Sequence, residues 1–167
     1  RGLPFYLAAA SLYKKLKKAE MPLCIPEISN SSTSSTTLTS AYNVNLFLRE
    51  YHGKNRSPIV PNSIDISSKG RIIILTGPNQ GGKTTFTQAV GIIQIFAQTG
   101  LFIPAASARI SIADKVLTHF PALEAPSEQK GRLGEEASRF RDIFSELTPK
   151  SLLLLNEPFT STSSGES

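Results

Sequence analysis

Residues 71–85 read RIIILTGPNQGGKTT, and this stretch decides the fold. Its first six residues are mostly β-branched, which is typical of a buried parallel strand. The glycine-rich segment that follows matches G-x-x-x-x-G-K-[ST] without deviation and ends at Lys83 and Thr84. Residues 83–99 then predict an amphipathic helix with its apolar stripe at Phe86, Val90, Ile93 and Ala97. A strand, a glycine-rich turn and a helix in this order predict a phosphate-binding loop.

The chemistry of this loop follows from its residue types. Glycines let the backbone curl until successive N–H groups face one anion, and the helix N-terminus adds partial positive charge at the same point. Lys83 can reach the β- and γ-phosphates, the Thr84 hydroxyl can bind Mg²⁺, and Thr85 is the next hydroxyl. We therefore expect this loop to bind a nucleoside triphosphate and Mg²⁺. The alternative is that the motif is a chance glycine-rich turn without a ligand. The predicted phosphate-binding residues are Gly77, Pro78, Asn79, Gln80, Gly81, Gly82, Lys83, Thr84 and Thr85.

A second strand motif lies at residues 151–157, which read SLLLLNE. Four leucines followed by two polar residues are typical of a Walker B strand, which supports the metal and the attacking water. Asn156 stands where an aspartate is usual, and it brings an amide without negative charge to the predicted metal site. Glu157 is placed to act as the general base. The alternative is a core strand with polar residues at its exit.

The rest of the chain predicts an α/β domain with a mostly parallel sheet. Further strands are expected around residues 64–66 and within 108–118, and a helix over 135–147. A helix is also expected over residues 3–20, where a run of lysines is more often a solvated face than a phosphate contact. Residues 29–40 contain ten Ser or Thr residues and predict a loop.

Composition narrows the class of protein. The chain has 167 residues, enough for one domain plus a short appendage. Its net charge of +5 lies in residues 1–70, where nine basic residues outnumber four acidic ones, an excess that permits nucleic-acid contact but is weak support for it. The single cysteine, Cys24, excludes an internal disulfide and indicates a reducing, cytoplasmic location. No apolar run approaches the ~20 residues that span a bilayer, so no membrane partner is expected.

The string TGPNQGGKTTF at Thr76–Phe86 resembles the phosphate-binding loop of MutS-type DNA mismatch repair ATPases. The resemblance continues through Gln98–Ala105 and Asp114–His119, and then through Asn156-Glu157 and Thr162-Ser163. Order and spacing agree over about residues 59–166. The sequence therefore divides into a connector at 1–58, with the Ser/Thr-rich loop, and a partial ATPase domain at 59–167.

The resemblance implies an ABC-type P-loop ATPase that binds ATP and Mg²⁺ and works as a dimer, most simply a homodimer. In that family each ATP lies between the loop of one subunit and a signature segment of the other, and the ATP state is coupled to a DNA clamp. By position, Thr84 and Asn156 would lie at the metal and Glu157 would be the hydrolytic base. The stretch Ile59–Asn62 resembles the family's adenine contact, which points to Val60 and Asn62.

Several departures from the family pattern indicate a divergent branch. The signature segment usually begins Ser-Thr-Phe, whereas the matching place reads GRLGEE from Gly131. Gly131 and Arg132 would then meet the γ-phosphate across the dimer through backbone N–H groups or a guanidinium. The chain has no room for a mismatch-reading domain and stops at Ser167, just past the second strand motif, so we expect an ATPase domain truncated at its C-terminus.

Three functions fit these patterns. The first is the ATPase of a MutS-like DNA repair protein that acts on mismatched or branched DNA. The second is a nucleotide-binding dimerisation module with little turnover, suggested by Asn156 and Gly131. The third is a transporter-type ABC subunit, which the lack of an LSGGQ-like string and the 73-residue separation of Lys83 from Asn156 disfavour.

Overall fold

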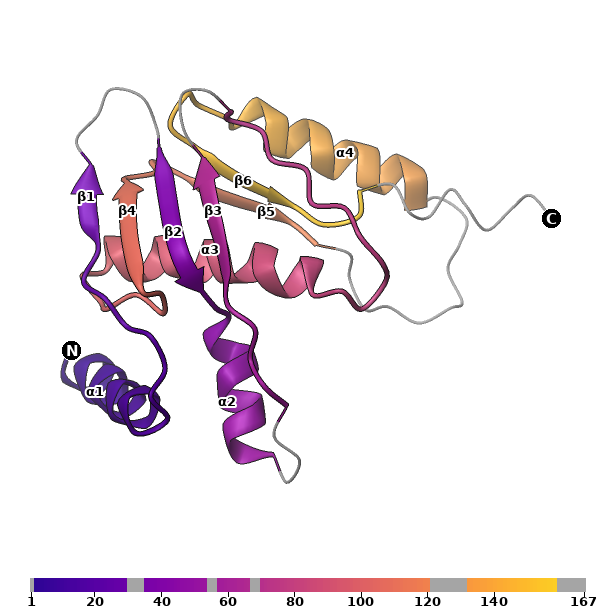
Figure 1. The fold of residues 1–167 in the computed structure, drawn as a ribbon. Coiled ribbons are helices and arrows are strands. Elements are labelled where there is room, and N and C mark those ends of the chain that lie inside the picture. The colour runs from indigo at the N-terminus through magenta and orange to yellow at the C-terminus, as the bar shows by residue number, and fades with distance from the viewer. Residues whose placement is uncertain (1, 30–34, 54–56, 67–69, 121–131, 159–167) are drawn as a thin grey trace. The chain divides into compact units, whose positions relative to one another are not determined.

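The computed structural model describes residues 2–29, 35–53, 57–66, 70–120 and 132–158 (Figure 1). The chain divides into two compact units, Arg1–Ile112 and Ala113–Ser167, and each is described by itself. The predicted boundary between residues 58 and 59 falls inside the first unit, and the division into connector and ATPase domain stays a prediction. Over the described residues, no helix combines the length and apolar character needed to cross a bilayer.

The first unit contains three helices, α1 (Leu3–Lys18), α2 (Val44–His52) and α3 (Lys83–Gln98). The predicted helices at 3–20 and 83–99 are thus confirmed to within two residues at each end. Lys14, Lys17 and Lys18 are exposed, which agrees with a solvated face. The lysines in the last turn of α1 also complement the helix dipole. Helix α2 was not predicted, because the weak alternation at 43–48 masks a helical spacing of its buried residues, Val44 and Phe47.

The sheet of the first unit is mixed rather than mostly parallel. Its strands are β1 (Glu27–Ser29), β2 (Thr36–Ala41), β3 (Asn62–Ile66) and β4 (Ser107–Ser111), in the order β1-β4-β2-β3. Strand β1 runs parallel to β4, while β2 runs antiparallel to both β4 and β3. The prediction of a loop over 29–40 was wrong for β2, since its threonines suit a pleated strand and Leu38 is fully buried.

The predicted strand at 71–76 is also wrong. The structure assigns no strand to Ile72–Thr76, and none of the described strands pairs with it. The side chains of Ile72 and Ile74 are 84% and 81% exposed. β-Branched residues favour an extended backbone, but a strand also needs a neighbour that accepts and donates its ladder hydrogen bonds.

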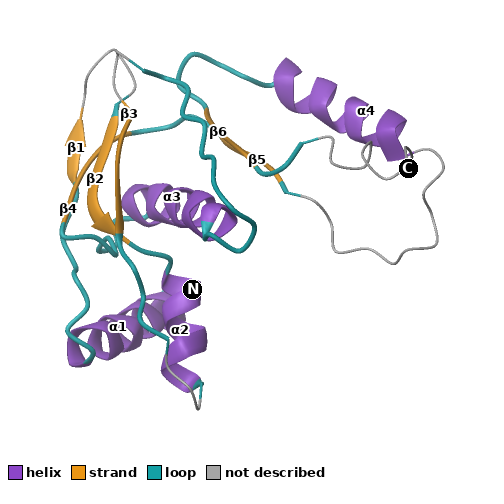
Figure 2. Cartoon of the chain, turned by 45° about the vertical axis from the view of Figure 1, so that its right-hand side comes forward, coloured by secondary structure: helices purple, strands orange, loops and turns teal. Residues whose placement is uncertain are grey.

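Helix α3 lies across one face of the four-stranded sheet (Figures 1 and 2). Exposed and buried residues alternate over the first four residues of β4, as expected for a sheet with one covered face. The stripe predicted for α3 is confirmed at Val90, Ile93 and Ala97, which are all buried. Gln94, also buried, donates from Nε2 to the carbonyl oxygen of Ser111 at 3.0 Å and ties the helix to the end of β4.

An apolar cluster joins the three helices of the first unit. Its buried members are Leu16 from α1, Val44 and Phe47 from α2, and Tyr42 between β2 and α2. Partly buried residues of α3, including Ile92 and Phe96, pack against this cluster. The N-terminal helices and the helix after the glycine-rich loop therefore share one core.

The second unit is a single β-α-β motif of β5 (Val116–His119), α4 (Arg132–Ser145) and β6 (Leu152–Leu155). Strands β5 and β6 are parallel, with Val116 opposite Leu152 and His119 opposite Leu155. The helix predicted over 135–147 is confirmed, although α4 begins three residues earlier than expected. The leucine-rich strand predicted within 151–157 is confirmed as β6. The single strand expected within 108–118 is in fact two, β4 and β5.

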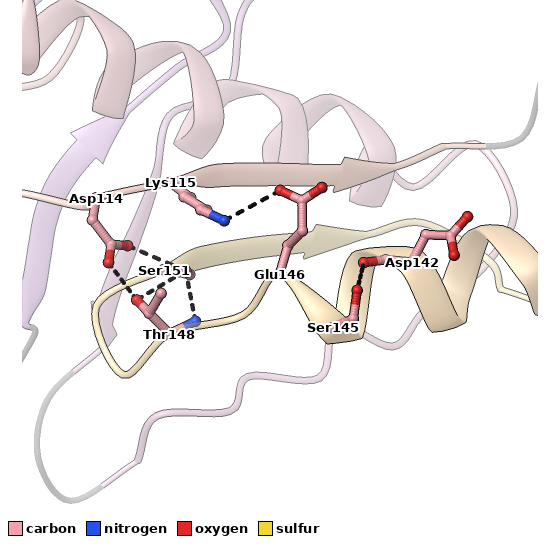
Figure 3. A network of polar contacts seen from close by, with 7 residues as sticks. All are labelled: Asp114, Lys115, Asp142, Ser145, Glu146, Thr148 and Ser151. Carbon is pink, nitrogen blue, oxygen red and sulfur yellow. Dashed lines mark hydrogen bonds and ion pairs between the residues drawn. The ribbon is translucent and has the colours of Figure 1, made fainter.

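Hydroxyl groups fasten the entry to β6 against the start of β5 (Figure 3). The Asp114 carboxylate accepts hydrogen bonds from the Thr148 hydroxyl and, at 3.2 Å, from the Ser151 hydroxyl. The Ser151 hydroxyl also accepts from the backbone N–H of Thr148 at 3.0 Å. Nearby, Lys115 pairs with Glu146 at 3.2 Å. Donation by Thr148 is the main reason that the pKa of Asp114 lies below its ordinary value.

Candidate functional site

The predicted phosphate-binding loop has an unusual backbone. Gly77 and Gly82 have φ values of 145° and 81°, and Gln80 between them has a φ of 63°. The N–H of Gly81 donates to the carbonyl oxygen of Pro78 at 3.1 Å, which closes a tight turn. A Cβ atom on Gly81 would lie only 2.9 Å from that same oxygen. Glycine is therefore required at Gly81 by contact and at Gly82 by conformation.

Lys83 folds its side chain back over this turn. Its Nζ donates to the carbonyl oxygens of Gly77 at 2.8 Å and Pro78 at 2.7 Å. The ammonium group is thus held beside the loop, at the residue where α3 begins. Gly82, the N-cap of α3, provides no side-chain acceptor for the first-turn N–H groups. A positive charge and a helix N-terminus on one tight loop form a favourable environment for an anion.

The two threonines after Lys83 lie in the first turn of α3 and are partly buried. The Thr85 carbonyl oxygen accepts a hydrogen bond from Asn43 Nδ2 at 2.8 Å. Sequence reasoning missed Asn43. The signal that could have found it is an asparagine directly before a short amphipathic segment, which is a common N-cap pattern.

The predicted adenine contacts lie at the start of β3 in the first unit. The side chain of Val60 is 72% exposed, and Asn62 Nδ2 donates to the Val60 carbonyl oxygen at 3.2 Å. An exposed apolar side chain can lose water-accessible surface by packing against a planar base. The assignment of these two residues to adenine stays a prediction.

Asn156 and Glu157 follow β6 in the second unit. The N–H of Asn156 donates to the His119 carbonyl oxygen at 2.9 Å, which extends the β5–β6 pairing by one residue. Glu157 is exposed and has a φ of 43°, in the left-handed region that non-glycine residues rarely adopt. Strained backbone of this kind is concentrated at functional sites. The carboxyl ends of parallel strands are also where ligands bind in open α/β sheets.

His119 and Glu136 make a further contact at this edge that sequence reasoning missed. His119 is 8% exposed, and its Nε2 lies 3.2 Å from Glu136 Oε1 on α4. The His119 ring also packs edge-on against Phe140, with ring centroids 4.5 Å apart. Helix α4 is thereby fastened to the end of β5 that holds Asn156.

The two halves of the predicted nucleotide site belong to different units. Gly77–Thr85, Val60 and Asn62 lie in the first unit, and Asn156 and Glu157 lie in the second. Of the predicted signature residues, Gly131 lies outside the described residues and Arg132 is the first residue of α4. Thr162 and Ser163, which belong to the family resemblance, also lie outside them.

The predicted Mg²⁺ ligands are a hydroxyl, Thr84, and an amide, Asn156. Within the described parts of the chain, His, Cys, Asp and Glu side chains form no group of three or more that could hold a metal ion. At nucleotide sites Mg²⁺ commonly takes several of its ligands from phosphate oxygens and water. Thr84 lies in the first unit and Asn156 in the second, and their assignment to Mg²⁺ stays a prediction.

Comparisons with known proteins agree with the motifs. Residues 73–167 match the family described as MutS domain V. The chain is 36% identical over 138 residues to the DNA mismatch repair protein MutS of Prochlorococcus marinus, covering 81% of this chain and 14% of that protein. It is 35% identical over 156 residues to the DNA mismatch repair protein MSH3 of Kluyveromyces lactis, covering 83% and 15%.

A third relative, the DNA mismatch repair protein MutS of Microcystis aeruginosa, is 40% identical over 103 residues, which cover 59% of this chain and 12% of that protein. The chain thus spans about one seventh of the length of the first two of these relatives. The family match covers more than half of the chain, from residue 73, just before the glycine-rich motif, to residue 167. The chain therefore belongs to the MutS family.

Proposed function

We propose that this chain is the ATP-binding and ATP-hydrolysing part of a MutS-type DNA repair protein. In fold terms it is a P-loop ATPase of the ABC type. The observation that carries the proposal is the loop Gly77–Gly82, whose positive-φ backbone places the Lys83 ammonium beside the N-terminus of α3. This combination suits the triphosphate of a nucleotide better than any uncharged ligand.

Each residue has a distinct role in the proposed reaction. Lys83 exchanges its bonds to the Gly77 and Pro78 carbonyl oxygens for bonds to phosphate oxygens, and so neutralises charge that builds up in the transition state. Thr84 and Asn156 would hold Mg²⁺, directly or through water. Glu157 accepts a proton from the water that attacks the γ-phosphorus, and the products are ADP and inorganic phosphate.

The partners of this activity are also proposals. A second ATPase subunit would close the site, with Gly131 and Arg132 contributed across the dimer. The names of the relatives describe DNA mismatch repair proteins, which supports DNA as the ligand of the full-length protein. ATP binding would then drive dimer closure on mismatched or branched DNA. Membership of the MutS family speaks against the transporter-type alternative.

A second candidate is a nucleotide-binding module with little turnover. It is favoured by Asn156, which would bring no negative charge to the metal, and by Gly131, which lacks the hydroxyl of the serine that usually begins the signature segment. Both departures would slow hydrolysis without weakening the phosphate contacts of the loop.

Turnover of ATP by the full-length protein, measured with and without duplex, mismatched and branched DNA, distinguishes these functions. For the proposed ATPase we expect turnover that DNA changes, and we expect Glu157→Gln to bind ATP as the wild type does while losing hydrolysis. Nucleotide binding with no turnover under any DNA condition would favour the second candidate. Equal turnover by Glu157→Gln would remove Glu157 from the mechanism, and a wild type that does not bind ATP would contradict the proposal.

A further inference from the structure

Asn43 lies between β2 and α2, and only 4% of it is exposed. Its Oδ1 accepts hydrogen bonds from the N–H groups of Asn45 at 2.9 Å and Leu46 at 3.1 Å, which caps α2. Its Nδ2 donates to the Thr85 carbonyl oxygen at 2.8 Å. One buried side chain therefore joins the start of α2 to the first turn of α3, across 42 positions of sequence.

The surroundings fix which way the amide of Asn43 points. Two N–H donors face one side of it and a carbonyl acceptor faces the other. Exchanging its oxygen and nitrogen would set donors against donors and an acceptor against an acceptor. An aspartate at this position could still accept hydrogen bonds from the N–H groups of Asn45 and Leu46. It has no N–H group to donate to the Thr85 carbonyl oxygen. Serine could cap the helix, but its side chain is too short to reach both helices.

The acceptor is well placed to affect the loop. Thr85 is the third residue of α3 and directly follows Lys83 and Thr84, the two residues predicted to contact phosphate and metal. A bond to its carbonyl oxygen holds the helical turn on which both side chains are mounted. Small displacements of groups that bind a reacting ligand are costly, so a fixed first turn favours binding.

Apolar contacts connect the same two helices farther along α3. Val44 and Phe47 of α2 are buried in the cluster against which Ile92 and Phe96 of α3 pack. The bond from Asn43 is a polar contact at the end of α3 nearest the loop. Because α2 and α3 are held at both places, a change in the first turn of α3 acts on α2, and the reverse must hold by linkage.

We propose that Asn43 is a positioning residue for the phosphate-binding loop. Its bond to Thr85 holds the first turn of α3 in its nucleotide-binding geometry and couples nucleotide binding to the start of α2. This inference rests on the proposed function, since it requires that the loop bind a nucleotide.

The test compares Asn43→Ser and Asn43→Asp with the matched control Asn45→Ser in the full-length protein. Asn45 is exposed and lies two residues away, in the first turn of α2. We expect both Asn43 variants to bind MgATP about threefold to tenfold more weakly in a calorimetric titration, the effect of one lost hydrogen bond. The control should bind as the wild type does. Agreement between the neutral and the charged variant separates loss of the bond from a charge effect.

Hydrogen exchange gives a readout that simple helix capping would not change. In the wild type, MgATP should slow exchange of the Asn45 and Leu46 amides. In Asn43→Asp the carboxylate still caps these amides, but the link to Thr85 is gone, so the slowing should be lost. Asn43→Asp also keeps the test available if Asn43→Ser loses its folded circular dichroism spectrum, because an aspartate cap supports α2 at least as well as a serine cap.

The outcomes separate the two proposals. Wild-type MgATP affinity in both Asn43 variants, with slowed exchange retained, would overturn the role of Asn43 and leave the proposed ATPase intact. Absence of MgATP binding by the wild type would overturn the proposed function itself, and the role of Asn43 with it.

Discussion

The ammonium nitrogen of Lys83 lies 2.7 Å from the carbonyl oxygen of Pro78, five residues earlier in the chain. This contact, with its neighbour at Gly77, keeps a positive charge at the loop where α3 begins. The loop backbone and the lysine are therefore arranged together, and their separate contributions can be measured.

Lys83→Ala should weaken ATP binding by about tenfold to a hundredfold, because a hydrogen bond to a charged group contributes about 1.5–3 kcal/mol. Titration with a fluorescent ATP analogue measures this change. Lys14→Ala, which removes an exposed lysine from α1, is the control. Wild-type affinity in Lys83→Ala would show that the loop does not hold phosphate.

Gly81→Ala should also impair ATP binding, because its Cβ would lie 2.9 Å from a backbone oxygen that cannot easily move. Gly82→Ala should act through its φ of 81°, at a cost of about 1–2 kcal/mol for a residue with a side chain. Gly70→Ala is the matched control, since its Cβ would meet nothing within 4 Å. If all three variants bind ATP equally, the loop geometry does not set affinity.

Asn156→Asp should tighten MgATP binding by restoring a negative ligand at the predicted metal site. The measurement is a Mg²⁺ titration at fixed ATP, with ATP binding in EDTA as the reference. We expect a lower Mg²⁺ requirement in the variant and unchanged binding in EDTA. An identical Mg²⁺ dependence in both proteins would mean that Asn156 does not face the metal.

The Asp114 network should make the second unit sensitive to acid. Hydrogen bonding lowers the pKa of Asp114 from its ordinary value of 3.8, so its stabilising effect is complete above that value. The effect is lost as the pH falls through the lowered folded-state pKa. Urea unfolding followed by a probe on β6 should show this loss in the wild type and a smaller pH dependence in Asp114→Asn.

Thr148→Val is the matched variant for that experiment, because it removes the main cause of the lowered pKa and keeps the carboxylate. Glu27→Gln is the control for acid sensitivity elsewhere, since the Arg109 guanidinium lowers the pKa of Glu27 in the first unit. A steeper acid dependence in Asp114→Asn than in the wild type would contradict the assignment.

His119 and Glu136 should be energetically coupled, because both are largely buried and lie 3.2 Å apart. A double-mutant cycle of His119→Ala and Glu136→Ala should give a coupling of about 0.5–3 kcal/mol in the free energy of unfolding. Arg141→Ala on the exposed face of α4 is the control. Additive effects of the two substitutions would show that the contact does not hold α4 to β5.

Much of the local structure could be predicted from the sequence. The helix from Lys83 and the strand of four leucines have unambiguous periodicity and clear end signals, and both are found within one or two residues of their predicted bounds. These segments needed only local information. The motif G-x-x-x-x-G-K-[ST] likewise depends on adjacent residues, and the structure places Lys83 against its own loop.

What could not be predicted depends on pairing between distant segments. Whether Ile72–Thr76 forms a strand depends on a neighbour, and Thr36–Ala41 becomes a strand because β3 and β4 flank it. Asn43 and His119 act through partners that are 42 and 17 residues away in the sequence. No periodicity reveals such contacts, because they are set by topology.

The strand order β1-β4-β2-β3 has a consequence for how a gene of this family can be divided. Strand β4 lies between two strands that precede residue 42, although β4 itself follows the helix of the phosphate-binding loop. A cut or recombination junction near residue 58 would separate β4 from both of its neighbouring strands, β1 and β2. It would also separate α3 from Asn43, which donates to the Thr85 carbonyl oxygen. The N-terminal segment and the loop are therefore expected to be inherited and exchanged together, as one unit.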